Sequence, residues 1–203
     1  MPLLSYCILR GRCRSCGAPF AFRYFLVEIF TALLAVALVH RFGVTVTALG
    51  YFAFGAALIA ITFIDLDYQL IPDVISLPGI VTGVFFSLVS PILTVVDSLL
   101  GLAAGAGVLL AVAWGYYALT GKEGMGGGDV KLLAMIGAFL GWRSIPFTLL
   151  VASSVGSAVG VGIMIRSQAD SKLAIPFGPF LSLGALCYLF FGEGLIDWYL
   201  NLL

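Results

Sequence analysis

Long apolar stretches alternate with short polar segments along most of the chain. Brief groups of charged residues, glycine and proline separate seven apolar runs, at residues 24–40, 44–64, 74–91, 96–119, 130–142, 146–165 and 174–191. About 20 apolar residues in a helix cross the roughly 30 Å hydrocarbon core of a bilayer, and only the fifth run is clearly shorter. The runs lack the alternation of membrane strands. The pattern therefore predicts an all-α, polytopic helical membrane protein with about seven transmembrane helices.

The composition agrees with a membrane protein. Of the 203 residues, 62% are hydrophobic and 10% are charged, far from the averages of soluble domains. Lys plus Arg number 10 and Asp plus Glu number 10, so the net charge of zero gives no indication of nucleic acid as a partner. We expect two parts: a basic, turn-rich segment at residues 1–23 without a signal peptide, and a transmembrane domain at 24–203.

The distribution of basic residues predicts an orientation. Cytoplasmic loops of membrane proteins are enriched in Lys and Arg. If residues 1–23 are cytoplasmic, seven helices leave only Arg41 and Arg143 on the other side. The remaining eight basic residues are then cytoplasmic, namely Arg10, Arg12, Arg14, Arg23, Lys122, Lys131, Arg166 and Lys172. This orientation also puts the acidic loop at 65–73 and the glycine-rich turn at 121–129 on the cytoplasmic side.

Two of the ten acidic residues stand out by their placement. Asp65 ends a long apolar run, where the helix dipole disfavours a negative charge. Asp129 begins another run, where the dipole favours the ionised form. Most of the others fall in predicted loops or caps, and Asp73 is expected to be a helix N-cap. If Asp65 and Asp129 meet, one protonated and one ionised carboxyl form an aspartyl protease dyad.

Three glycines precede Asp129. Gly126, Gly127 and Gly128 allow positive φ angles and a close approach of the backbone to a substrate or a facing helix. Taken alone, such a string also fits a tight turn between two helices. Small residues elsewhere, including Gly101, Gly105 and Gly107, are expected to pack at helix–helix contacts.

Four motifs in order resemble the type IV prepilin peptidases, the leader peptidases of type IV pili and of type II secretion pseudopilins. They are PLLSY at 2–6 with RGRCRSC at 10–16, IDLDYQLIPD at 64–73, GMGGGDVKL at 124–132 and IPFGPF at 175–180. The resemblance implies a polytopic aspartyl protease of the bacterial inner membrane that cleaves a basic leader next to a glycine, on the cytoplasmic side. By position it makes Asp65 and Asp129 catalytic and Gly126 and Gly128 motif glycines. Asp67 is the main rival of Asp65.

The resemblance also suggests a metal, zinc, and a cofactor, S-adenosylmethionine. Family members usually begin with a further transmembrane helix and a loop whose two Cys-x-x-Cys pairs bind zinc, and this sequence opens just before the second pair, Cys13 and Cys16. Structural zinc takes about four ligands, and Cys7 would be a third. The alternative is that Cys13 and Cys16 are reduced and bind no metal. Many members also methylate the new amino terminus with S-adenosylmethionine. Because the family associates methylation with that loop, this activity stays open.

These observations predict an aspartyl endopeptidase that needs no cofactor for proteolysis. The Asp65 and Asp129 carboxyls activate a water molecule, and the substrate is a prepilin or pseudopilin whose apolar segment lies in the bilayer. One alternative is a proton-coupled transporter, which would be expected to carry charges nearer the middle of its helices. Another is an inactive membrane scaffold. Cleavage of a prepilin separates the three.

Overall fold

The protein is a bundle of helices. The computed structural model describes residues 21–122, 126–167 and 176–200, together with 6, 8, 11, 12, 14 and 17–19. The helices in the described part are α2 (Phe22–Phe42), α3 (Val46–Tyr68), α4 (Asp73–Val89), α5 (Val95–Thr120), α6 (Gly127–Leu140), α7 (Ser144–Ser167), α8 (Gly178–Cys187), the π-helix η1 (Tyr188–Gly192) and α9 (Glu193–Leu200).

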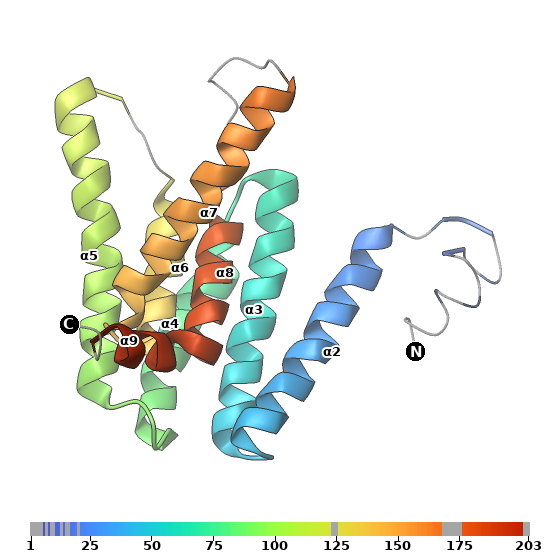
Figure 1. Cartoon of the computed structure of the whole chain (residues 1–203), viewed down its shortest axis with the longest axis horizontal. Coiled ribbons are helices and arrows are strands. Elements are labelled where there is room, and N and C mark those ends of the chain that lie inside the picture. Colours follow the sequence, from blue (N-terminus) through green and yellow to red (C-terminus); the bar gives the residue numbers. More distant parts are fainter. Residues whose placement is uncertain are drawn as a thin grey trace.

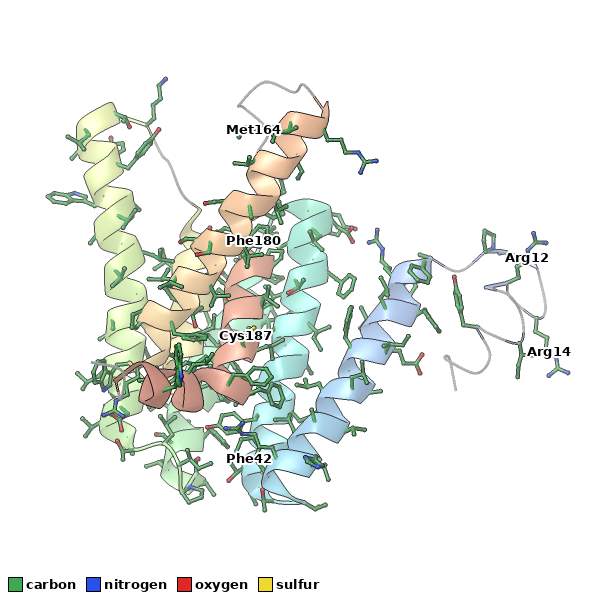
Figure 2. All side chains as sticks on the ribbon, in the orientation of Figure 1. Arg12, Arg14, Phe42, Met164, Phe180 and Cys187 are labelled. Carbon is green, nitrogen blue, oxygen red and sulfur yellow. The ribbon has the colours of Figure 1, made fainter. Side chains whose placement is uncertain are left out.

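The predicted helical membrane architecture is confirmed. The seven apolar runs coincide in order with α2 to α7 and with α8 continued by η1. In the described part of the chain, α2, α3, α5 and α7 are long and apolar enough to cross a membrane. The 14 residues of α6 extend about 21 Å, which is less than the thickness of a hydrocarbon core. The division at residue 23 stays a prediction, while Figure 2 shows Arg12 and Arg14 beyond the start of α2.

The short helix α6 is the centre of the bundle. It contacts α4, α5, α7 and α8, and Figure 1 shows it between α5 and the pair α7 and α8. All its residues from Leu132 to Leu140 are buried. A helix that is apolar on all sides is expected to be enclosed by others. In contrast, α2 leans against α3 at the edge of the bundle.

Glycines bring α5 and α6 together. A methyl group on Gly137 would lie 2.0 Å from the Gly101 carbonyl oxygen, and one on Gly105 would lie 2.4 Å from the Leu133 carbonyl oxygen. The buried Ser98 hydroxyl donates across the same contact to the Ala138 carbonyl oxygen, at 2.7 Å. Close packing and polar contacts of this kind hold helices together in a bilayer. The expectation for Gly107 was wrong, because nothing lies within 4 Å of its Cβ position.

The chain reverses between successive helices, so several helix ends gather at one end of the bundle. There α3 ends and α4, α6 and α8 begin, and Figure 1 shows α5 and α7 ending on the same side. The start of α2 is tied to the end of α3 by an ion pair between Arg23 and Asp67. At the opposite end, Arg41 donates a hydrogen bond to the Phe190 carbonyl oxygen in the π-helix. Both aspartates singled out in the sequence therefore lie at the same end.

The α5–α6 contact generates the first prediction. Gly137→Ala should destabilise the protein by about 1–3 kcal/mol, because its methyl group meets backbone rather than a side chain that can move. Gly107→Ala is the matched control and should stabilise α5 by about 0.5–1 kcal/mol. Thermal unfolding in detergent measures both. Equal melting temperatures for the two variants would contradict the described packing.

Candidate active site

Asp65 is held at the junction of two helices. It lies in the last turn of α3, which ends at a left-handed Gln69 whose N–H donates to the Asp65 backbone carbonyl at 2.9 Å. The Asp65 side chain is buried, and the backbone N–H of Gly178 donates to its Oδ2 at 3.0 Å. Gly178 is the first residue of α8, where the helix dipole favours a carboxylate. A methyl group on Gly178 would lie 2.6 Å from Oδ2, so glycine is required for this contact.

Asp129 is the third residue of α6 and is half-buried. Gly126 is the N-cap with φ −72°, and Gly127 and Gly128 are already helical, so the expected positive φ angles are absent from these glycines. The expected close approach is confirmed at one of them. A methyl group on Gly128 would lie 2.9 Å from the Cβ of Ile71. Gly128 thus lets the loop before α4 pass directly over the start of α6.

Both carboxyls line one open cavity of about 500 Å³. Its wall is formed by the end of α3, the loop that follows, and the starts of α4 and α6. An ion pair spans the rim, with Lys131 Nζ 2.7 Å and 2.8 Å from the two oxygens of Asp73. The lining residues are Asp65, Gln69, Leu70, Ile71, Pro72, Asp73, Gly126, Gly127, Gly128, Asp129 and Lys131. The arrangement places two carboxyls around a space that admits water and a peptide.

The other aspartates of the motif are placed differently. Asp67 is exposed, lies outside the lining of the cavity and pairs with Arg23. The structure thus puts Asp65 and not its rival Asp67 beside Asp129. Asp73 is the first helical residue of α4 and Pro72 is the N-cap, so the N-cap expected at Asp73 was wrong by one position.

Comparisons with known proteins show the family of the chain. The model of the type IV leader peptidase family matches residues 51–161, and that of the bacterial peptidase A24 N-terminal domain matches residues 1–42. The chain belongs to the type IV leader peptidase family. A prepilin leader peptidase/N-methyltransferase of Aeromonas hydrophila is 45% identical over 202 residues, which are 99% of this chain and 69% of the relative. Proteins of the same description from Pseudomonas putida and Pseudomonas aeruginosa are 41% and 40% identical, over 95% and 99% of this chain and 67% and 69% of their own. No solved structure matches the chain.

The leader peptidase match spans both candidate carboxyls and the glycines before Asp129. Gly178 lies beyond it, and the sequence analysis did not give Gly178 a role. The signal was present, because IPFGPF at 175–180 is one of the four motifs that carried the resemblance. The motif alone does not show that Gly178 donates a hydrogen bond to Asp65, because 113 positions separate the two residues.

The pKa of Asp129 is shifted in the opposite direction to the expected one. The helix-dipole argument predicted that the ionised form is favoured. Burial, and to a lesser extent the neighbouring charge of Asp65, instead raise the pKa of Asp129 from 3.8 to about 6. At pH 7 the Asp129 carboxyl is still largely ionised, and as a stronger base than an exposed carboxylate.

The predicted zinc ligands Cys13 and Cys16 lie outside the described residues, as does Cys7. Within the described ranges, no three His, Cys, Asp or Glu side chains are grouped closely enough to hold a metal ion. Zinc binding at Cys13 and Cys16 stays a prediction.

The raised pKa of Asp129 predicts a pH-dependent effect on stability. The pKa of this carboxyl is about 6 in the folded protein and 3.8 in the unfolded chain, so the unfolded chain ionises first as pH rises. The carboxyl therefore destabilises the fold increasingly between pH 3.8 and pH 6. Asp129→Asn removes this cost. Its melting temperature in detergent should therefore exceed that of the wild type at pH 7.5, with a smaller difference at pH 4.5.

Asp67→Asn is the control for this measurement, because Asp67 is exposed and ion-paired. It should not raise the melting temperature at pH 7.5. If Asp129→Asn does not raise the melting temperature at pH 7.5, or raises it more at pH 4.5 than at pH 7.5, the surroundings of Asp129 do not disfavour its ionised form.

Proposed function

We propose that this chain is an aspartyl endopeptidase that removes the basic leader from prepilins, with Asp65 and Asp129 as its catalytic carboxyls. The observation that carries the proposal is the cavity of about 500 Å³ that both carboxyls line. The charge of Asp65 acts on the pKa of Asp129, which supports a short separation. The relatives named prepilin leader peptidase support the choice of substrate.

The chemistry follows from two carboxyls that share one proton. The ionised carboxyl of the pair takes a proton from a water molecule, which attacks the scissile carbonyl carbon, while the protonated carboxyl donates its proton to the carbonyl oxygen. When the tetrahedral intermediate collapses, the first carboxyl gives the proton from water to the leaving amine, and the second takes its proton back from a hydroxyl of the intermediate. The Gly178 N–H holds Oδ2 of Asp65, which leaves Oδ1 for this proton transfer. No covalent intermediate is required.

The orientation in the membrane follows from the charges around the cavity. The end of the bundle that holds the cavity also carries Arg23, Lys131 and the basic residues that follow α5 or end α7, Lys122 and Arg166. The opposite end carries Arg41 and Arg143. By the positive-inside rule, this distribution supports a cavity on the cytoplasmic side, and the membrane implied by the family resemblance is the bacterial inner membrane. A leader at that surface meets the carboxyls while the apolar segment of the substrate stays in the bilayer.

Two finer activities are part of the proposal. Pseudopilins of type II secretion present the same kind of leader and are further expected substrates. The relatives are described as N-methyltransferases as well, so methylation of the new amino terminus with S-adenosylmethionine is a second expected activity. The resemblance associates methylation with the loop of two Cys-x-x-Cys pairs, and the second pair, Cys13 and Cys16, lies outside the described residues.

The transporter and the scaffold are weaker explanations. A proton relay through the bilayer would be expected to need carboxyls along the middle of helices, whereas Asp65 and Asp129 lie at helix ends around a cavity. An inactive scaffold has no need of a buried carboxyl held by a glycine amide. A cleavage assay with a model prepilin in detergent separates the three functions.

Replacement of the carboxyls tests the proposed function. Asp65→Asn and Asp129→Asn should each lower the rate of leader cleavage by about 10²–10⁴-fold, because each removes acid–base catalysis without a change of shape. Asp67→Asn is the matched control two positions away and should keep most of the activity. If Asp67→Asn is inactive and Asp65→Asn active, the assignment of the first aspartate is wrong.

The support of Asp65 by α8 gives a further prediction. Gly178→Ala puts a methyl group 2.6 Å from Asp65 Oδ2 in the present geometry, so the carboxyl must move. A displacement of about 1 Å in a reacting group lowers a rate about 10²-fold. We expect a loss of that order in kcat for prepilin cleavage. Gly162→Ala in α7, with nothing within 4 Å of its Cβ position, should cleave at the wild-type rate.

A further inference from the structure

The loop between α3 and α4 lines the cavity that holds the two carboxyls. It begins at Gln69, whose backbone is left-handed with φ 51° and ψ 41°, a conformation that residues other than glycine rarely adopt. This turn reverses the chain just after Asp65. Every residue from Gln69 to Asp73 then lines the cavity. The loop is therefore part of the site and not only a connection.

One side chain in this loop touches the supports of both carboxyls. The Cβ of Ile71 lies 2.9 Å from the position of a methyl group on Gly128, the residue before Asp129. The Cδ1 of Ile71 lies 3.3 Å from the corresponding position on Gly178, whose N–H holds Asp65. Ile71 is only 6% exposed. It therefore fills the space between the start of α6 and the start of α8.

The loop is fixed on both sides of Ile71. Before it lies the left-handed turn at Gln69, and after it Asp73 forms the ion pair with Lys131. Lys131 is on α6, two positions after Asp129, so the pair ties the loop to the helix that carries this carboxyl. Isoleucine is branched at Cβ and has few rotamers, which makes it a stiff spacer.

We propose that Ile71 is a positioning residue that sets the separation of the Asp65 and Asp129 carboxyls, an inference that rests on the proposed peptidase function of this pair. Its Cβ fixes the start of α6 and its Cδ1 fixes the start of α8. A pair that shares one proton and one water molecule requires a defined separation, and supporting side chains commonly define it to about 0.5 Å. The length and stiffness of isoleucine suit this role.

Two substitutions shorten the Ile71 side chain in steps. Ile71→Val removes Cδ1, the atom that reaches the start of α8 at Gly178, and keeps the branched Cβ against Gly128. Ile71→Ala also removes both Cγ atoms, so that only Cβ stays against the start of α6. We expect kcat for prepilin cleavage to fall about tenfold for Ile71→Val and about 10²-fold for Ile71→Ala, with KM changed by less than about threefold.

Ile136→Ala is the matched control. Ile136 is fully buried in α6 and does not line the cavity, so its truncation destabilises the core as the truncation of Ile71 does. Its kcat per folded molecule should equal that of the wild type. If Ile71→Ala lowers only the melting temperature and the yield, as Ile136→Ala does, Ile71 is an ordinary core residue and the proposal is wrong.

A second measurement does not depend on activity. Asp65→Cys and Asp129→Cys are combined in a protein whose four native cysteines are replaced by serine, and disulfide formation in membranes is timed with copper phenanthroline. Addition of Ile71→Ala should make the cross-link form several-fold faster, because the spacer between the helix starts is gone. Equal rates with and without Ile71→Ala would overturn the proposal. A wild type that cleaves no prepilin while the cross-linking rates differ would instead overturn the proposed function.

Discussion

The hydrogen bond from the Gly178 N–H to the Asp65 carboxyl is the contact on which the site depends. A carboxyl buried at the end of α3 needs a partner, because burial without one is costly. The start of α8 supplies that partner together with the favourable end of a helix dipole. Since a side chain at position 178 would collide with Asp65, the contact requires glycine. The two helices are thereby joined where the chemistry takes place.

The central helix α6 brings the second carboxyl to the same level. It lies against α5 through glycine-to-backbone contacts and beside α4, where Met135 fills the space over Gly79 and Phe139 the space over Gly83. These contacts leave α6 little freedom to slide. Asp129 is consequently fixed at the end of the bundle where Asp65 is held. Membrane proteins keep irregular backbone where it lines a cavity, and the loop at residues 69–72 between α3 and α4 follows this rule.

The sequence was sufficient to predict the helices, and it led to the two candidate carboxyls that line one cavity. The apolar runs predict α2 to α8, because polar and turn residues interrupt the apolar pattern where each helix ends. The motif positions favoured Asp65 over Asp67, and Asp67 lies outside the lining of the cavity. The φ angles of Gly126 to Gly128 and the pKa of Asp129 were beyond such reasoning. Glycine permits positive φ without requiring it, and burial depends on packing between distant segments. The roles of Gly178 and Ile71 arise from contacts that only the folded chain reveals.

Whether Asp65 and Asp129 act as one pair is tested most directly by the residual cleavage rate of the variant that carries both Asp65→Asn and Asp129→Asn, compared with the two single variants. Groups that act as a unit are strongly non-additive, since loss of either disables both. We expect the double variant to be no slower than the slower single variant. A loss equal to the product of the two single losses would show that the carboxyls act independently, and would contradict the dyad.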